Sequence, residues 1–414
     1  MHRRNRVVIT GMGVLAPNGT GLDAFWNSLL SGKSGIGPIT LFDATNFRSR
    51  IAGEVKNFDP LDYIEPELKP RRMARHTQLA YAATMMALID AGLDPNNLNL
   101  PSPTPVVVGV STSAIDVIES VYRAVEDNKP NRAPTSSAAA SIPQAAANFI
   151  ADRIGNCANA NTVSSACPSG LDAIAEAVAM IRNDEAEIAI AGGADAPVTP
   201  LTMASFIASG LSSEQNDAPE TASRPFDLLR DSGVISEGAG IFVLEHLDRA
   251  LARGAHIYAE ITGYGKLRDM NSHAPASGLG ESMRIAIANA ATTIEHIDYI
   301  CAYGPSHPVL DRAEIAMIKE VFGPRAYRIP VSSIKGVTGN ALAAGGPFQV
   351  IACALMLRDQ IIAPTANHEV ADPSCDLDLV PNRARKATIN SALINVRGIG
   401  GSASTLIMKR VNGA

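Results

Sequence analysis

The sequence is poor in aromatic residues, has few cysteines and lacks long apolar runs. Phe, Trp and Tyr make up 5% of the 414 residues, whereas glycine occurs 33 times, a balance that suits closely packed helices and sheets. No apolar run reaches the roughly 18 residues that a membrane-spanning helix needs. The net charge is −6 and there is no long basic run. We therefore expect no membrane span, and we do not expect nucleic acid as the main ligand.

The few cysteines indicate a reducing compartment. They are odd in number and lie in apolar or alanine-rich stretches, which predicts reduced thiols in a cytoplasmic protein. The first residues, MHRRNRVVITGMGVLAP, pass from basic side chains directly into a strand pattern without the features of a signal peptide. The cysteines are Cys157, Cys167, Cys301, Cys353 and Cys375.

Apolar runs of strand length alternate with helical patterns along the chain. Residues 171–182 repeat apolar side chains at helical spacing, and 72–91 has the pattern of a second helix that ends at Gly92. This alternation predicts a layered α/β fold, with helices covering sheets. The strand-like runs are 6–11, 104–110, 187–193, 239–245, 297–303, 329–333 and 387–394.

A weak internal repeat indicates two related halves. Residues 162–184 and 330–359 each contain a strand ending in Val-Ser-Ser, a glycine-containing loop and an alanine-rich helix ending in arginine. The segment EHLDRALARGA, near residue 250, has the pattern of a helical connector. We therefore expect one half over 1–250 and the other over 251–414.

The loop SSACPSGLDA places Cys167 between the end of a strand and the start of a helix. Free backbone N–H groups and the positive end of a helix lower the pKa of a thiol and favour its nucleophilic form. The same N–H groups can stabilise an oxyanion. A small buried cysteine at a tight turn is an equally good interpretation of this loop alone.

Two glycine-rich turns are weaker signals. The turn NVRGIGGSAS, residues 395–404, can complete an oxyanion hole or be a simple tight turn. It runs into the strand-like stretch STLIMKRV and not into a helix, and GMGVLAP at 11–17 has no acidic residue at the expected distance. Neither therefore predicts a dinucleotide site.

Together these loops resemble those of the β-ketoacyl synthases of the thiolase fold. The segments SSACPSGLDA, RPFDLLRDSGVISEGAGIFVLE, AYGPSHP, SSIKGVTGN and RGIGGSAS follow in the order of that family, and the similarity extends from VVITGMGVLAPNG to TLIMKR. The resemblance implies a duplicated α/β fold, layered α-β-α-β-α with two mixed sheets.

In this family a cysteine accepts the acyl chain from an acyl carrier protein. Two histidines then hydrogen-bond the malonyl thioester carbonyl during decarboxylation, supported by a lysine and a glutamate. The resemblance places Cys167 at the nucleophile, Lys335 at the lysine and Glu237 at the glutamate. The corresponding oxyanion loop is Gly398, Ile399, Gly400 and Gly401.

Both family histidines are replaced in this chain. The first position is Tyr303 in AYGP, and the second is Asn340 in TGNA. Both side chains donate neutral hydrogen bonds, but neither becomes a cation. One preorganised oxyanion donor typically lowers the activation free energy by ~3–4 kcal/mol. Losing both histidines therefore raises the barrier by ~5–8 kcal/mol if the effects are roughly additive. We therefore do not expect efficient decarboxylative condensation.

Further segments resemble the chain length factor, the ketosynthase β subunit of type II polyketide synthases. They are SGLDAIAEA, VLDRAEIAMIKEVFGPR, AAGGPFQVIACALMLRDQIIAPT and CDLDLVPN. That subunit also lacks the histidines and carries Arg-Gly before its glycine turn, as at Arg397 and Gly398. It forms a heterodimer with an active ketosynthase α subunit and shapes the tunnel for the poly-β-keto chain. Typical members have glutamine at the nucleophile position, whereas this chain has Cys167.

The resemblance implies no directly bound cofactor and no metal, because the phosphopantetheine of the acyl carrier protein carries the substrate. One alternative is a divergent β-ketoacyl-carrier-protein synthase or acyltransferase that uses Cys167 without the histidine pair. A purely structural scaffold is less favoured, because Lys335, Glu237 and the glycine turn are retained.

Three accessory sites complete the interpretation. His307, on the Tyr303 loop, is a displaced catalytic histidine or, as we favour, a surface or supporting one. Residues 114–125 form a helix whose face can close the tunnel or be ordinary core. A basic cluster at the start of the 72–91 helix can dock the acidic carrier protein or be a solvated helix end. The tunnel candidates are Ile115, Ile118 and Tyr122, and the docking candidates are Lys69, Arg71, Arg72 and Arg75.

Overall fold

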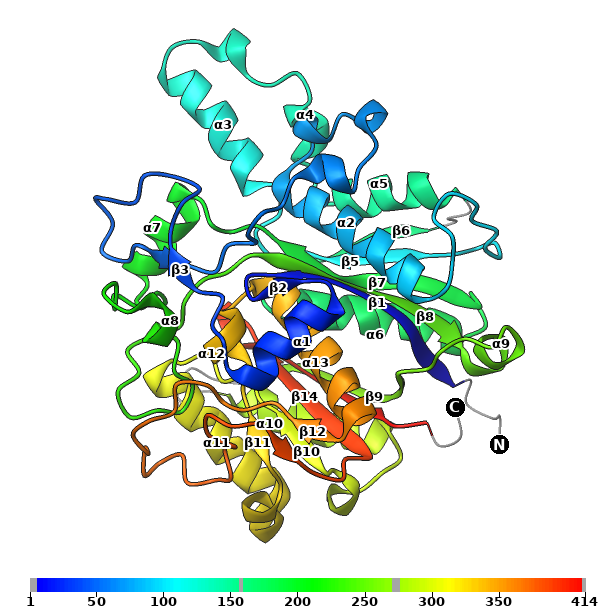
Figure 1. Ribbon diagram of the computed structural model, residues 1–414, viewed down its shortest axis with the longest axis vertical. Coiled ribbons are helices and arrows are strands. Elements are labelled where there is room, and N and C mark those ends of the chain that lie inside the picture. Colours follow the sequence, from blue (N-terminus) through cyan, green and yellow to red (C-terminus); the bar gives the residue numbers. More distant parts are fainter. Residues whose placement is uncertain (1–5, 156–158, 270–275, 412–414) are drawn as a thin grey trace.

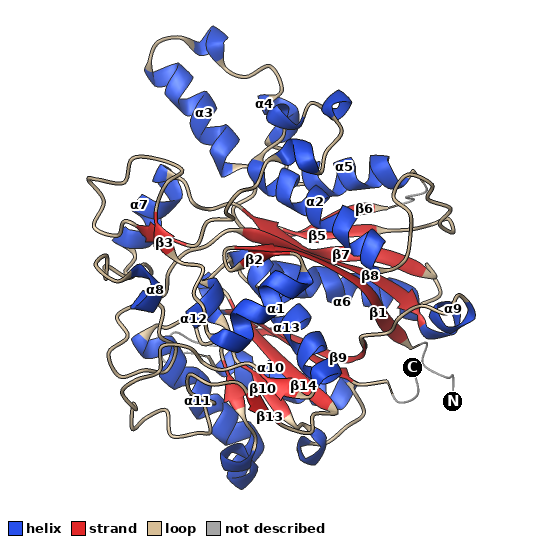
Figure 2. Cartoon of the chain, in the orientation of Figure 1, coloured by secondary structure: helices blue, strands red, loops and turns tan. Residues whose placement is uncertain are grey.

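The computed structural model describes residues 6–155, 159–269 and 276–411. Within these ranges, two sets of five main strands have the same order and the same directions (Figures 1 and 2). The first set has the order β6-β5-β7-β8-β1, comprising β6 (Ala160–Val163), β5 (Val106–Gly109), β7 (Ile188–Asp195), β8 (Gly238–His246) and β1 (Val7–Ala16).

The second set repeats this arrangement. Its order is β11-β10-β14-β15-β9, comprising β11 (Val331–Ser332), β10 (Tyr299–Cys301), β14 (Ser391–Arg397), β15 (Ser402–Lys409) and β9 (Ala259–Arg268). In each set the first three strands are parallel and the last two are antiparallel to their neighbours. The weak repeat in the sequence thus corresponds to a repeated topology.

The two sets are joined edge to edge. Antiparallel pairing of β1 with β9, from Val7 opposite Ile261 to Ile9 opposite Ala259, makes one continuous hydrogen-bonded sheet. The family resemblance implied two mixed sheets, and each set of five strands corresponds to one of them. The junction spans a few residues at one end of each strand, so each set keeps its own mixed pairing and its own layer of helices.

Helices fill the space between the two sets and cover their outer faces (Figure 1). The central layer is α6 (Ser169–Arg182) and α13 (Gly345–Asp359), which contact each other as well as strands of both sets. A side chain at Gly170 would lie 2.2 Å from the carbonyl oxygen of Ala343, so this close approach requires glycine. The outer helices are α2 (Arg75–Asp90) and α5 (Ala145–Ile154) on the first set, and α10 (Ser277–Asn289) and α11 (Pro308–Phe322) on the second.

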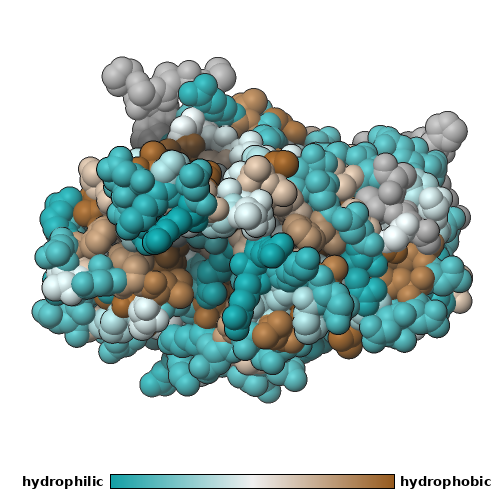
Figure 3. All heavy atoms as spheres, turned by 90° about the horizontal axis from the view of Figure 1, so that it is seen from above, coloured by the Kyte–Doolittle hydropathy of each residue, from teal (hydrophilic) through white to brown (hydrophobic). Residues whose placement is uncertain are grey.

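The excursion containing α3 (Ile115–Glu126) and α4 (Ser137–Ala140) projects from the body (Figure 1). Its apolar side chains Ile118, Tyr122 and Val125 are 46%, 59% and 54% exposed. Seen from above, the surface has apolar patches between hydrophilic ones (Figure 3). The α3 helix therefore presents apolar residues to the outside of the single chain.

Within the described ranges, no helix combines the length and the apolar character that a membrane span requires. The described cysteines, Cys167, Cys301, Cys353 and Cys375, are free thiols, and Cys157 lies outside the described residues.

The remaining α-helices and strands are short. They are β2 (Gly19–Thr20), α1 (Leu22–Ser31), β3 (Gly37–Pro38), β4 (Ile51–Ala52), α7 (Pro200–Ala208), α8 (Pro219–Ala222), α9 (Leu247–Ala252), α12 (Lys335–Thr338), β12 (Ile361–Ile362) and β13 (Arg385–Lys386).

Candidate active site

Cys167 lies in a sharp turn between β6 and α6. Ala166 before it has a φ of +64°, a strained conformation for a residue with a side chain. The turn is held by Ser169, whose hydroxyl accepts the N–H of Ser165 at 2.8 Å and donates to the carbonyl of Ala166 at 2.5 Å. Cys167 is 2% exposed and lines a cavity of about 330 Å³.

The pKa of Cys167 is raised, contrary to the prediction from its position at a helix start. Burial is the largest cause, because it disfavours the thiolate. A hydrogen bond from Tyr303, the charge of Lys335 and the backbone N–H of Ile399 all act in the opposite direction. The thiol is therefore protonated near neutral pH, and donors surround the sulfur.

The glycine turn lies directly against the cysteine loop. A side chain at Gly398 would lie 2.8 Å from Pro168 and 2.9 Å from Ala166. Gly400 and Gly401 have φ angles of +84° and +86°, in the region that favours glycine. The turn thus brings the N–H of Ile399 to the sulfur, where it can also donate to an oxyanion.

Tyr303 faces Cys167 across the cavity. Its hydroxyl donates a hydrogen bond to Sγ of Cys167 at 3.8 Å. Burial raises the pKa of Tyr303 well above its ordinary value, so the phenol keeps its proton. Asn340 lines the same cavity, and its Oδ1 is buried without a hydrogen-bond partner in the described part of the chain. The structure therefore brings Tyr303 and Asn340, the residues expected at the two histidine positions, to the Cys167 cavity.

Lys335 lies behind Tyr303 and is 2% exposed. Its Nζ is 4.7 Å from the centre of the Tyr303 ring, a cation–π distance, and donates to Oε1 of Gln349 at 3.1 Å. Burial lowers the pKa of Lys335 to about 8, although nearby acidic groups raise it. Gln349 was not recognised from the sequence, because it lies within a continuous apolar helix.

Glu237 does not lie at the cavity. Its carboxylate pairs with Arg75, at 2.6 Å and 2.7 Å, and accepts the N–H of Val55 at 2.9 Å. Glu314 on α11 supports the site instead, accepting the backbone N–H groups of Tyr303 at 2.9 Å and the following residue at 2.8 Å. The sequence signal that was missed is an acidic residue on the apolar face of the helix after AYGP.

His307 lines the cavity, whereas the sequence favoured a surface or supporting position. It is the N-cap of α11. Arg397 also lines the cavity, and its guanidinium is paired with Asp269, with Nη2 2.5 Å from Oδ2. The remaining wall is mainly apolar and includes Phe206, Leu211, Val309, Leu310 and Ile399.

The accessory candidates lie away from this cavity. Ile115 is partly buried, while Ile118 and Tyr122 are exposed on α3, and none of them lines the cavity. Whether they close a tunnel in a complex stays a proposal.

The basic cluster is smaller than predicted. Lys69, Arg71 and Arg72 are exposed. Arg75 is instead held by Glu237 and lies 5.7 Å above the ring of Phe58. Among the described residues, no cluster of His, Cys, Asp and Glu side chains suits a metal ion.

Comparison with known proteins identifies the family. Residues 4–250 match the beta-ketoacyl synthase N-terminal domain, and residues 258–369 match the beta-ketoacyl synthase C-terminal domain. The chain therefore belongs to the β-ketoacyl synthase family. The tetracenomycin polyketide synthase ketoacyl synthase alpha subunit of Streptomyces glaucescens is 39% identical, covering 99% of this chain and 98% of that protein. The 3-oxoacyl-[acyl-carrier-protein] synthase 2 of Coxiella burnetii is 38% identical, covering 99% of both chains.

Solved structures agree with the predicted thiolase-like fold. The ishigamide ketosynthase/chain length factor superposes with a TM-score of 0.91 and 34% identity, covering 99% of this chain and 100% of that chain. A type II polyketide synthase ketosynthase solved with its acyl-carrier protein has a TM-score of 0.90 and 31% identity, covering 99% and 100%. The chain is thus a ketosynthase-family protein of the kind found in type II polyketide synthases.

Proposed function

We propose that this chain is the chain length factor, or ketosynthase β subunit, of a type II polyketide synthase. It pairs with an active ketosynthase α subunit, and the pair encloses the growing poly-β-keto chain delivered by an acyl carrier protein. The observation that carries this proposal is that Tyr303 and Asn340, which the sequence resemblance assigns to the positions of both family histidines, line the Cys167 cavity.

The chemistry of these two side chains supports a non-condensing role. Decarboxylation of a malonyl thioester develops negative charge on the thioester oxygen, and preorganised donors stabilise it. The Tyr303 hydroxyl is directed at the cysteine sulfur and retains its proton. Asn340 provides a neutral amide. Neither Tyr303 nor Asn340 therefore provides a group that can change its charge near neutral pH, as an imidazole at these positions could.

The solved relatives support the assembly that we propose. One is described as a ketosynthase/chain length factor, and another as a ketosynthase in complex with its acyl-carrier protein. The exposed apolar side chains of α3 are suited to burial against a partner subunit. The mainly apolar wall of the Cys167 cavity is suited to a carrier-bound acyl chain.

The test compares the isolated chain with its complex. The purified chain alone should release almost no carbon dioxide from malonyl-carrier protein, whereas co-expression with a ketosynthase α subunit should give a heterodimer that makes polyketide. Efficient decarboxylation by the isolated chain, with no gain on adding the ketosynthase, would contradict the proposal. A reaction from which the chain is omitted serves as the blank, because it measures the uncatalysed loss of carbon dioxide.

Retention of Cys167 favours a second candidate function, that of an acyltransferase. The sulfur has donors from Tyr303 and from the Ile399 N–H, which suit a thioester intermediate. Mass spectrometry of the chain after incubation with an acyl-carrier protein separates the two functions. A stable acyl group on Cys167 that later moves to another thiol supports the acyltransferase, and its absence supports the chain length factor.

A further inference from the structure

Arg397 is the one side chain with a formal charge at the wall of the Cys167 cavity, within the described ranges of the chain. The other polar groups there are neutral, and most of the wall is apolar or glycine. They include the imidazole of His307, whose pKa is lowered by burial and by nearby arginine charges. A mainly apolar cavity with one positive charge is suited to an acyl ligand that carries a negative charge.

Arg397 lies at the end of the cavity that contains the sulfur. It is the last residue of β14, and a side chain at the next residue, Gly398, would lie 3.2 Å from the backbone nitrogen of Cys167. Burial raises the pKa of Tyr303, and the charge of Arg397 acts on that phenol in the opposite direction. The guanidinium is therefore close to the groups that would surround a bound thioester.

Only one edge of this guanidinium is used by the protein. Nε and Nη2 of Arg397 donate to the same oxygen, Oδ2 of Asp269, at 3.2 Å and 2.5 Å. The other oxygen of Asp269 accepts the backbone N–H of Gly278 at 2.9 Å. No hydrogen bond from Nη1 of Arg397 occurs in the part of the chain that the structure describes. Because arginine has five N–H donors in a fixed fork, a second edge remains for a ligand.

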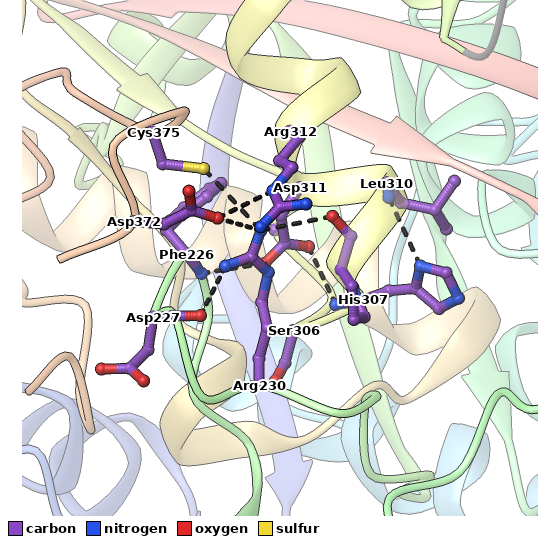
Figure 4. Close-up of polar contacts among 12 residues, drawn as sticks. Phe226, Asp227, Arg230, Ser306, His307, Leu310, Asp311, Arg312, Asp372 and Cys375 are labelled. Atoms are coloured by element: carbon purple, nitrogen blue, oxygen red, sulfur yellow. Dashed lines mark hydrogen bonds and ion pairs between the residues drawn. The ribbon is translucent and has the colours of Figure 1, made fainter. Parts of the chain in front are cut away.

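A second arginine of this chain shows that one guanidinium accommodates two carboxylates (Figure 4). Arg230 lies between Asp311 and Asp372, with Nε 3.4 Å from the first and Nη2 2.9 Å from the second. All three side chains are buried, so this cluster is complete without a ligand. Arg397 has one protein carboxylate, and its second place faces a cavity.

We propose that Arg397 binds the free carboxylate of a carrier-bound acyl group inside the Cys167 cavity. This inference rests on the proposed function, in which the cavity takes carrier-bound acyl chains. The carboxylate comes from one of two sources, a malonyl group or the far end of a longer dicarboxylic acyl chain. Planar pairing of a guanidinium with a carboxylate makes both affinity and orientation depend on that group.

Pairing with Arg397 stabilises the carboxylate of the bound group itself. Decarboxylation removes the negative charge from the carboxylate, so this interaction is stronger in the ground state than in the transition state and does not accelerate that step. Arg397 therefore favours holding such an acyl group over consuming it, which agrees with the non-condensing role proposed above.

Variants of Arg397 separate ligand binding from the pairing with Asp269. Arg397→Gln removes the charge but keeps an amide donor for Asp269, and Arg397→Lys keeps the charge but loses the planar fork. Arg328→Gln removes an exposed arginine that does not line the cavity, and it is the control matched in charge. Melting temperatures show which variants are folded. If Arg397→Gln does not fold, Arg397→Lys supplies the test, with a smaller loss of ~3- to 10-fold.

The binding test uses hydrolysis-stable amide analogues of acyl-pantetheines in two matched pairs. One pair is a malonyl probe and its carboxamide counterpart, in which an uncharged amide replaces the carboxylate, and the other is a glutaryl probe and its carboxamide counterpart. Titration calorimetry on the full-length chain gives the four dissociation constants without a partner subunit. We expect Arg397→Gln to weaken a carboxylate probe ~10- to 100-fold, the usual effect of losing hydrogen bonds to a charged group. The carboxamide probes and the Arg328→Gln variant should show no such loss.

The pattern of losses identifies the source of the carboxylate. A loss confined to the malonyl probe identifies a malonyl group, and one confined to the glutaryl probe identifies a longer chain. If the parent binds each carboxylate probe no more tightly than its carboxamide counterpart, or if the folded Arg397 variants bind the carboxylate probes as the parent does, Arg397 is only the partner of Asp269. If the parent binds none of the four probes, the proposed use of the cavity fails and this inference fails with it.

Discussion

The hydroxyl of Tyr303 donates a hydrogen bond to the sulfur of Cys167 at 3.8 Å. Burial raises the pKa of this phenol well above its ordinary value and also raises the pKa of the thiol. The pair therefore consists of two protonated groups, one a donor to the other. An imidazole at the same place would exchange protons near neutral pH, whereas this phenol does not.

Restoring histidine at both replaced positions should restore decarboxylation. We expect the Tyr303→His, Asn340→His double variant to release carbon dioxide from malonyl-carrier protein at least about tenfold faster than the parent. The reason is that a single preorganised donor typically accelerates such a step by that factor or more. Lys335 and the glycine turn remain in place to support it. The single variants are the controls, and a folded double variant no faster than the parent would count against the assignment of these positions.

The exposed arginines before α2 should contribute to carrier docking. We expect Arg71→Glu with Arg72→Glu to weaken binding of the acidic acyl carrier protein, with a smaller difference at high salt. Arg328→Glu, an exposed arginine of the second half, is the matched control. Arg75 is unsuitable, because its removal would leave Glu237 buried and unpaired. Equal binding by the double variant and the control at low salt would exclude this surface.

The α3 helix should control product length in the complex. A bound chain cannot grow past a closely packed side chain, so Tyr122→Ala or Ile118→Ala should lengthen the polyketide by roughly one or two ketide units if neighbours do not fill the space. Both residues are exposed in the single chain, so neither change should unfold it. Ile142→Ala, equally exposed outside this helix, is the control. Unchanged products from an intact complex would exclude α3 as the tunnel end.

His76 should make stability depend on pH. It is fully buried, and burial lowers its pKa to about 4. In the unfolded chain the pKa is about 6.5, so between these values only the unfolded chain takes up the proton. The free energy of unfolding should therefore fall as the pH falls through this window, by about 3 kcal/mol in total. Urea unfolding of the parent and of His76→Gln measures it, and an identical pH dependence in both would contradict the assignment.

Much of the fold follows from local sequence, whereas most of the site follows from the family resemblance. Strand-length apolar runs identify most of the main strands, although they did not include β9. Cys167 was singled out from its own loop, and Tyr303, Lys335 and Asn340 were assigned by the resemblance. The glutamate was misplaced because its surroundings depend on distant partners: Glu237 pairs with Arg75, 162 positions away. Thiol acidity was also mispredicted, since burial outweighs the effect of the helix start. These properties depend on packing, which spacing along the chain does not reveal.

We propose that this chain supports polyketide synthesis without being its condensing centre. The most direct measurement is polyketide output by the reconstituted heterodimer with its carrier protein, comparing Cys167→Ala in this chain with the same change at the cysteine of the ketosynthase. We predict that Cys167→Ala leaves output largely intact, whereas the ketosynthase change abolishes it. Loss of output from Cys167→Ala in an intact complex, with the ketosynthase cysteine untouched, would contradict the account.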